Sequence, residues 1–209
     1  MSAIHLAGGC FWGVQDVFSR IPGVIDTECG YANGDAHYVP DYMLVCSGRM
    51  GYREAVKVEY DPAEVSLEDL LSVFFLIIDP TQERRQGNDV GIQYQTGVYW
   101  SDRESEDIVR RIFAEQEALY DEFHVEMGPL EYWTRAEDEH QDYLARNPAG
   151  YCHIPVWKKE LVDKLVCRST KFGSDRRQDL PGRTPVKREC PIKSVRRFRW
   201  SSQSISSLN

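Results

Sequence analysis

Segments with a strand-like alternation of apolar residues and segments with helical spacing follow one another along residues 3–154. The stretch EAVKVEYDP alternates over residues 55–60 and ends at an Asp-Pro pair, as a half-buried strand does. Ser66 with Asp69 resembles a capping box at the start of a helix. Six apolar residues behind it share one helix face: Leu67, Leu70, Leu71, Phe74, Phe75 and Ile78. This pair of patterns predicts a strand followed by a helix that packs on it.

The same reasoning extends to the rest of this region. Further strands are predicted at 3–7, 24–34 and 96–100 and around residue 125, and further helices at 14–21, 101–120 and 137–144. Ser101 and Glu104 are the predicted cap of the helix at 101–120. The order β-α-β-β-α-β-α-β-α predicts an α+β protein, a two-layer sandwich with a ferredoxin-like core in which helices pack on a mixed sheet.

Charge divides the chain near Pro155. Residues 1–154 contain 11 Lys and Arg against 28 Asp and Glu, a net charge of −17, whereas residues 155–209 contain 14 against 5, a net charge of +9. We therefore predict a folded domain at 1–154 and a basic C-terminal extension at 155–209. The extension begins with apolar residues at helical spacing: Trp157, Leu161, Val162, Leu165 and Val166. They predict one amphipathic helix docked on the domain, and the Ser-, Arg-, Lys- and Pro-rich remainder from about residue 172 predicts disorder.

The composition excludes some partners and favours a location. A basic run can contact nucleic acid or an anionic membrane, but such runs are more often solvated tails, so we expect neither partner. No run approaches the ~20 apolar residues that span a bilayer. The N-terminus has neither the basic nor the apolar region of a secretory signal. We therefore expect a cytoplasmic protein, and a monomer by default.

Six cysteines lie at positions 10, 29, 46, 152, 167 and 190. None forms a Cys-x-x-Cys pair, and no Cys/His spacing is typical of zinc, so we expect no metal. Without a secretory signal, a structural disulfide framework is not expected. Catalytic or redox-active thiols, or inert buried ones, remain.

The stretch AGGCFWG places Cys10 where a predicted strand passes into a predicted helix. Unpaired backbone N–H groups and the helix dipole favour a thiolate there, which predicts a lowered pKa for the thiol. Gly8 and Gly9 permit a tight turn and the close approach of a ligand. Phe11 and Trp12 offer an apolar wall for a small hydrophobic group. The alternative is an inert core cysteine beside aromatics that only pack.

A carboxylic acid and two phenols could complete a reactive site. Glu54 stands directly before the strand at 55–60, at the expected mouth of the domain, and a predicted polar loop at 81–95 contains Asp89 and Tyr94. A thiolate, a protonated acid and phenolic hydroxyls suffice to attack and protonate a polar S=O group. Each residue also has a structural explanation: a surface carboxylate for Glu54, a turn for Asp89, and packing for Tyr42 and Tyr94.

Four motifs together resemble peptide methionine sulfoxide reductases of the A type. They are GGCFWG, VCSG with EAV eight residues after Cys46, DPTQ…RQGNDVGIQY and EDEHQDYLARNPAGYC, and the resemblance covers residues 3–154. One such motif would be a weak signal. Four in the order and at the spacing of the family are specific.

The resemblance implies the reaction and its three main participants. Cys10 corresponds to the nucleophile that attacks the sulfoxide sulfur, releases methionine and becomes a sulfenic acid. Glu54 corresponds to the acid that protonates the sulfoxide oxygen. Cys152 corresponds to the resolving thiol that condenses with the sulfenic acid to a disulfide, before the sulfur can be oxidised further.

The resemblance also implies the residues that bind the substrate. Phe11 and Trp12 correspond to the pocket for the S-methyl group. Tyr42 and Tyr94 correspond to the phenols that bind the sulfoxide oxygen, and Asp89 to a nearby polar residue of the same site.

Further expectations concern the substrate and the reductant. The substrate is expected to be the S epimer of methionine sulfoxide, free or in oxidised proteins, so that the enzyme repairs oxidised proteins. Thioredoxin or another dithiol is expected to reduce the disulfide. The family needs no metal or bound organic cofactor.

The C-terminal extension departs from the family pattern. Members with a second recycling cysteine carry it in a short Gly-rich tail soon after GYC, whereas HIPVWKKELVDKLVC follows here. Cys167 could relay the disulfide outward, but its helical pattern favours a structural role, and Cys190 is expected to be incidental. Two other functions stay open: a thiol peroxidase that uses the Cys10 sulfenate, and a catalytically silent domain whose basic tail binds nucleic acid or a partner.

Overall fold

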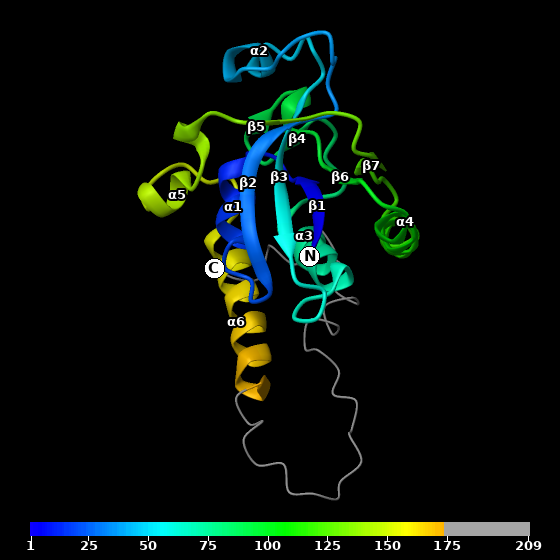
Figure 1. The fold of residues 1–209 in the computed structure, drawn as a ribbon, viewed down its shortest axis with the longest axis vertical. Helices are drawn as coiled ribbons and strands as arrows, with labels where there is room; N and C mark the ends of the chain where they lie inside the picture. The colour runs from blue at the N-terminus through cyan, green and yellow to red at the C-terminus, as the bar shows by residue number, and fades with distance from the viewer. Residues whose placement is uncertain (174–209) are drawn as a thin grey trace, which may run out of the picture.

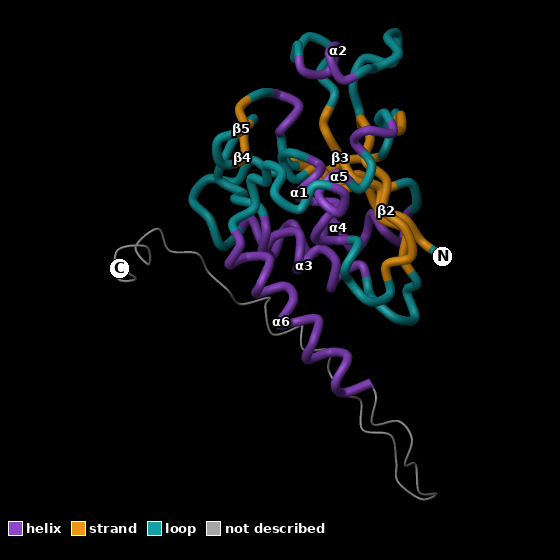
Figure 2. The backbone as a smooth tube through the Cα atoms, turned by 90° about the vertical axis from the view of Figure 1, so that its left-hand side faces the viewer, coloured by secondary structure: helices purple, strands orange, loops and turns teal. Residues whose placement is uncertain are grey.

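The computed structural model describes residues 1–173, which form a six-stranded sheet with helices packed on it (Figure 1, Figure 2). The strands are β1 Ser2–Ala7, β2 Val24–Ala32, β3 Arg53–Tyr60, β6 Gly97–Trp100, β7 Glu126–Pro129 and β8 Trp133–Arg135, while β4 Arg85–Gln86 and β5 Asp89–Val90 form a separate hairpin. The α-helices are α1 Phe11–Phe18, α2 Tyr42–Cys46, α3 Leu67–Ile77, α4 Arg103–Glu117, α5 Tyr143–Arg146 and α6 Val156–Gly173. Two 3-10 helices are η1 Ile92–Tyr94 and η2 Asp138–His140.

The strand order β7-β6-β1-β3-β2-β8 confirms the predicted fold class. The four central strands β6-β1-β3-β2 are antiparallel, and in the chain they belong to a β-α-β-β-α-β unit with α1 and α3 as its helices. This is the ferredoxin-like arrangement. The edge strand β7 pairs parallel to β6, which makes the sheet mixed, and β8 pairs antiparallel to β2.

The main core lies between the sheet and its helices. Val56 and Val58 of β3 are fully buried, and between them in the chain Lys57 points to the opposite, more polar face. Val14 of α1 and Phe74 of α3 belong to the same buried cluster. The alternation that predicted β3 is therefore the alternation between core and outer face.

Several local predictions are corrected. Asp102 rather than Ser101 caps α4, because its carboxylate accepts the Ser105 N–H at 2.8 Å. This helix ends at Glu117 rather than near residue 120, whereas the strand expected around residue 125 is present as β7. The helix predicted at 137–144 is two short turns, η2 and α5, and the predicted loop at 81–95 contains the β4–β5 hairpin and η1. Short elements such as α2 and β8 contain too few residues to show a hydrophobic period.

The helix predicted for the start of the extension is present as α6. Val162 and Leu165 are buried, while Trp157, expected on the same face, is half-exposed. The Lys158 ammonium donates to the carbonyls of Ile77 and Ile78 at 3.1 and 3.0 Å, which fixes α6 at the end of α3.

The other parts of the extension stay predictions. The division of the chain at residue 154 is one of them. The predicted disorder from about residue 172 falls almost entirely beyond residue 173, and with Cys190 and the side chain of Cys167 it lies outside the described part. Among residues 1–173, no helix is long and apolar enough to cross a membrane.

Candidate active site

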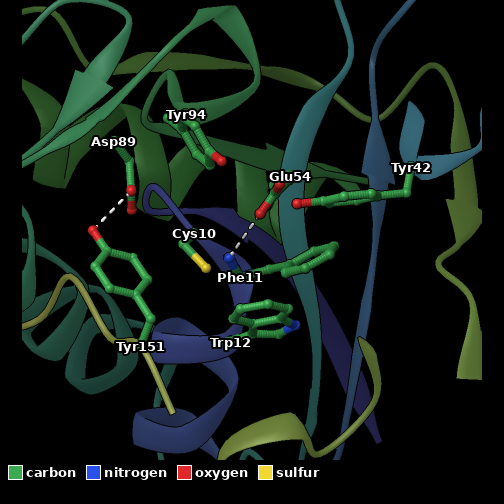
Figure 3. A pocket seen from close by; sticks show the side chains of 8 residues that line it. All are labelled: Cys10, Phe11, Trp12, Tyr42, Glu54, Asp89, Tyr94 and Tyr151. Carbon is green, nitrogen blue, oxygen red and sulfur yellow. Dashed lines mark hydrogen bonds between the residues drawn. The ribbon is translucent and has the colours of Figure 1, made fainter. Parts of the chain in front are cut away.

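A cavity of about 140 Å³ opens beside the start of α1. Eight residues line it: Cys10, Phe11, Trp12, Tyr42, Glu54, Asp89, Tyr94 and Tyr151 (Figure 3). Seven of these are site residues that the sequence predicts. Tyr151 is an addition, and Cys152 lies just outside the lining.

Cys10 occupies the N-cap position of α1, directly after β1. Gly9 makes the turn between them with a φ of +87°, in the region that favours glycine. A Cβ at Gly9 would lie 2.7 Å from Cβ of Gln86 and 2.9 Å from Nε2 of His153. Glycine is thus required both for the turn and for the close approach of these two side chains. Cys10 itself is only 6% exposed, at the floor of the cavity.

The predicted lowering of the Cys10 pKa is wrong for the substrate-free protein. Burial raises the pKa of this thiol well above its ordinary value, and the negative charge of Glu54 raises it further. A backbone hydrogen bond from Trp12 at the helix start opposes this rise but does not overcome it. The helix start therefore lowers the pKa of Cys10, but by less than the desolvation of the thiolate raises it.

Glu54 supplies a buried acid beside the thiol. It lies within β3, opposite Tyr31 of β2, rather than before the strand as the sequence suggested. It is 2% exposed, and its Oε2 accepts the backbone N–H of Phe11 at 3.1 Å. Burial raises the pKa of this carboxyl to about 8, since the Phe11 hydrogen bond only partly offsets it and the charge of Asp89 adds to it. Below this pH the side chain is a neutral proton donor.

The burial of Glu54 predicts a pH-dependent effect of Glu54→Gln on stability. The pKa rises from 4.5 to about 8 on folding, so the folded protein binds more protons than the unfolded chain between these values. The stability of the wild type should therefore fall as pH rises through this window, at a cost on the order of 3 kcal/mol by pH 7. Glutamine carries no such cost. In urea unfolding, the free energy of unfolding of the variant should increase relative to that of the wild type from pH 5 to pH 8. A difference between the two that is constant with pH would contradict the raised pKa of Glu54.

Two phenols face the cavity from separate elements. Tyr42 begins α2, and its hydroxyl points toward the Glu54 carboxyl group (Figure 3). Its backbone N–H donates to Oε1 of Glu137 at 2.8 Å, while Oε2 of Glu137 accepts the Tyr31 hydroxyl at 2.7 Å. Tyr94 ends η1. Burial raises the pKa of both phenols facing the cavity, so both stay protonated and can donate hydrogen bonds.

The β4–β5 hairpin presents Asp89 to the cavity. Oδ1 of Asp89 accepts the Tyr151 hydroxyl at 2.8 Å (Figure 3). Gln86 anchors the hairpin, since its side chain exchanges two hydrogen bonds of 2.8 Å with the backbone of Asp79. The polar loop predicted as functional is therefore an ordered part of the site.

Aromatic rings form the opposite wall. Trp12 stacks on Tyr143 with ring centroids 3.8 Å apart, and the Phe11 ring lies 6.0 Å from that of Tyr31. These contacts fix the orientation of both wall residues before any ligand binds.

Cys152 lies beside α1, the helix that Cys10 caps. A Cβ at Gly13 would stand 3.0 Å from the Cys152 sulfur, so glycine leaves room for this thiol one turn along from Cys10. The charge of an ionised Cys152 is among the groups that raise the Cys10 pKa. Cys29, in contrast, is buried with its thiol donating to Oε1 of Gln15, and its role is structural.

Three residues in or beside the site were not predicted from the sequence: Tyr151, Glu137 and His153. Tyr151 adjoins Cys152 in the GYC motif, which is the one signal that could have identified it. Glu137 opens the motif EDEHQDYLARNPAGYC and His153 directly follows it, but their contacts, with Tyr31 and Tyr42 for Glu137 and with the Gly8 carbonyl for His153, form only in the folded chain. One ring nitrogen of His153 lies within 4.8 Å of ligand atoms of Cys10 and Asp89, so the three could meet a metal ion. The expectation that no metal is bound stays a prediction.

Known proteins share the sequence of this chain over most of its length. The sequence model described as peptide methionine sulfoxide reductase matches residues 2–169. The peptide methionine sulfoxide reductase MsrA of Mycoplasma pneumoniae is 49% identical over 155 residues, which cover 74% of this chain and 98% of that protein. The MsrA of Clostridium botulinum is 46% identical over 155 residues, with the same two coverages of 74% and 98%.

Solved structures share the fold as well. The reduced form of Mxr1 from Saccharomyces cerevisiae is similar with a TM-score of 0.67 and 32% identity, covering 72% of this chain and 87% of that one. Methionine sulfoxide reductase A of Corynebacterium diphtheriae has a TM-score of 0.64 and 34% identity, covering 74% and 82%. With sequence, fold and the four motifs in agreement, the chain belongs to the peptide methionine sulfoxide reductase family, of the A type.

Proposed function

We propose that this chain reduces methionine-S-sulfoxide to methionine, and that Cys10 is the nucleophile. The observation that carries the proposal is the pairing of a buried thiol with a buried acid in one small cavity. Glu54 is held by the Phe11 N–H, and its pKa of about 8 leaves it protonated at neutral pH. A sulfoxide needs both partners, because its sulfur accepts the nucleophile while its oxygen accepts a proton.

The first step follows from these groups. The Cys10 sulfur attacks the sulfoxide sulfur, oxygen passes to Cys10, and the products are methionine and a Cys10 sulfenic acid. The thiol proton and the oxygen remain in the products, so the step balances without any other reactant. Protonated Glu54 has no charge to oppose the thiolate, which removes one of the two main causes of the high Cys10 pKa.

The cavity supports a methyl sulfoxide as the group that binds. Phe11 and Trp12 form a fixed apolar wall for the methyl group. Tyr42 and Tyr94 are protonated phenols that can donate to the sulfoxide oxygen, and Asp89 with Tyr151 borders the same space. A volume of about 140 Å³ suits the end of one side chain. Oxidised methionine, free or in a protein, fits this description.

The second step would regenerate the enzyme. Cys152 condenses with the Cys10 sulfenic acid to a disulfide and water, and thioredoxin or another dithiol then reduces the disulfide. This sequence needs no metal and no bound organic cofactor. The cytoplasmic location and monomeric state expected from the sequence stay predictions.

Replacing Cys152 with serine tests the second step. The variant should release one equivalent of methionine per protein and then stop, because the sulfenic acid has no partner thiol and thioredoxin has no disulfide to reduce. Methionine release measured over time, with thioredoxin and its recycling enzyme present, checks this. Continued turnover in the variant would assign the resolving role to another thiol.

A thiol peroxidase remains the second candidate, since peroxides also oxidise a thiolate to a sulfenic acid. The aromatic wall favours the sulfoxide, because hydrogen peroxide has no methyl group for Phe11 and Trp12 to contact. Comparison of second-order rates on hydrogen peroxide and on a methyl sulfoxide decides between them. We expect the sulfoxide to react faster, and a faster reaction with peroxide would favour the peroxidase.

A further inference from the structure

Three side chains with metal-ligating atoms meet beside the cavity. The Sγ atom of Cys10, a carboxylate oxygen of Asp89 and a ring nitrogen of His153 all lie within 4.8 Å of one another. They come from the N-cap of α1, from β5 and from the segment before α6, so no spacing in the sequence marks them. We propose that these three residues bind a zinc ion, and that zinc held there blocks the Cys10 thiol reversibly. The loss of activity rests on the proposed function, whereas the binding of the ion does not.

His153 presents a buried nitrogen to this place. Its side chain is 3% exposed, and its Nε2 lies 2.8 Å from the Gly8 carbonyl oxygen. A carbonyl only accepts hydrogen bonds, so Nε2 carries the hydrogen, and the neutral ring then has its lone pair on Nδ1. Nδ1 is buried and has no hydrogen-bond partner among the described residues. A histidine that binds a metal through one nitrogen usually donates from the other to a carbonyl or carboxylate, as His153 does to Gly8.

Asp89 is held in a similar way. Its Oδ1 accepts the Tyr151 hydroxyl at 2.8 Å, while its Oδ2 lies 4.0 Å from Nδ1 of His153. Oδ2 is also buried, and it accepts no hydrogen bond within the described part of the chain. Two buried polar atoms without hydrogen bonds are costly unless a further group meets them. A water molecule could bridge the two, but the Cys10 sulfur that faces the same space (Figure 3) is a weak hydrogen-bonding partner and a strong metal ligand.

The ligand set selects among metal ions. Mg²⁺ and Ca²⁺ take oxygen ligands, whereas Zn²⁺ binds thiolate, imidazole and carboxylate in one tetrahedral site. Ligand atoms around zinc lie roughly 3.3–3.6 Å apart, so the three atoms here must approach one another by about 1 Å. The thiolate and the carboxylate together balance the charge of Zn²⁺, as a buried site requires. Three protein ligands leave the fourth position for water.

Zinc at this place would occupy the reacting sulfur. When Cys10 coordinates the ion, its thiol proton passes to solvent and its sulfur is no longer available to attack a sulfoxide. A chelator that removes the zinc restores the thiol. The ion would therefore be a reversible inhibitor, outside the catalytic cycle, and it would protect Cys10 from alkylation while it is bound.

Cobalt(II) reports the ligands directly, because it occupies zinc sites and gives a charge-transfer band when a thiolate coordinates it. The reduced protein is titrated with Co²⁺, and Zn²⁺ is then added to displace it. We expect one metal ion per protein, with the charge-transfer band in the wild type and in Cys152→Ser and without it in Cys10→Ser. His153→Ala and Asp89→Asn should each weaken zinc binding at least about tenfold, the smallest loss expected even for a group that only orients a ligand.

Two further variants separate the ligands from the packing. Asp89→Asn keeps the shape of the side chain and an oxygen that can accept the Tyr151 hydroxyl, so it removes the carboxylate charge alone. His37→Ala is the matched control for His153→Ala. The His37 side chain is 92% exposed and belongs to no cluster of metal-ligating atoms among the described residues, so this variant should bind zinc as the wild type does.

Three results would overturn the proposal. They are a wild type that binds no metal, zinc binding of wild-type strength in both His153→Ala and Asp89→Asn, and loss of the charge-transfer band in Cys152→Ser, which would assign the ion to the two thiols. A second measurement needs no sulfoxide. Zinc should slow the alkylation of Cys10 by iodoacetamide at least about tenfold in the wild type, and less in Asp89→Asn at the same zinc concentration. If the protein reduces no sulfoxide, the proposed function fails, while the metal titration and the alkylation rates still decide whether the site exists.

Discussion

Replacing Cys10 with serine should abolish sulfoxide reduction, with a loss of at least about a thousandfold. The hydroxyl group of serine is a far weaker nucleophile toward sulfur, and among the side chains that the structure describes, Cys10 is the one thiol that lines the cavity. Cys152, the neighbouring thiol, lies beside Gly13 and outside the lining of the cavity. Reduction of a dabsylated methionine-S-sulfoxide, with dithiothreitol as reductant, measures the effect.

Cys190→Ser is the control for this variant. Cys190 belongs to the extension and is expected to be incidental, so its loss should leave the rate unchanged. Undiminished reduction in Cys10→Ser would disprove the assignment of the nucleophile. Equal losses in the two variants would point to a general sensitivity of the protein to thiol removal.

Glu54→Gln should lower kcat by roughly 10²- to 10⁴-fold, the range that general acid catalysis contributes. The amide keeps the shape of the side chain, and its oxygen can still accept the Phe11 N–H. It has no acidic proton to transfer to the sulfoxide oxygen as the S–O bond breaks. Steady-state rates on the same substrate measure the loss.

The pH dependence of the wild-type activity is an independent test of Glu54 as the proton donor. Glu54 is protonated below its pKa of about 8, so the donor form is present at neutral pH and disappears as pH rises through that value. The activity should therefore fall on the alkaline side near pH 8, and Glu54→Gln should lack this descending limb. Glu59→Gln, on the same strand but at the surface, should retain it. An unchanged alkaline limb in Glu54→Gln would assign the transition to another group.

The stability and activity effects of Glu54 have one origin. The burial that keeps the carboxyl protonated also makes its ionisation unfavourable in the folded state, so the acid destabilises the fold at neutral and alkaline pH. Glu54→Gln should thus give a protein that is more stable and nearly inactive. A trade-off between stability and activity is expected where an active site buries an ionisable group that has no partner of opposite charge.

The sequence was most informative where periodic patterns are long. The apolar face of α3, with five residues in the helix and Ile78 at its C-cap, predicts the helix, and the alternation along β3 predicts the strand. Their order with the neighbouring elements indicates the ferredoxin-like core. β8 was not predicted, because three residues are too few to show a hydrophobic period. Its strand conformation depends on pairing with β2, which is far away in the chain. The predicted cap of α4 was one residue too early, because Ser101 and Asp102 are both residue types that commonly cap helices.

The site shows a similar division. Cys10, Glu54 and Asp89 come from separate motifs and line one cavity in the structure. Their chemistry and the family resemblance had suggested that they share a site. The protonation of Cys10 was not predictable from its helix start, because burial depends on every element around it and dominates the local dipole.

The most direct test of the whole account is mass spectrometry of the reduced protein after one equivalent of methionine-S-sulfoxide. The account predicts one equivalent of methionine and one disulfide, and peptide mapping should find it between Cys10 and Cys152. A disulfide that excludes Cys10, or methionine release with all thiols still free, would contradict it.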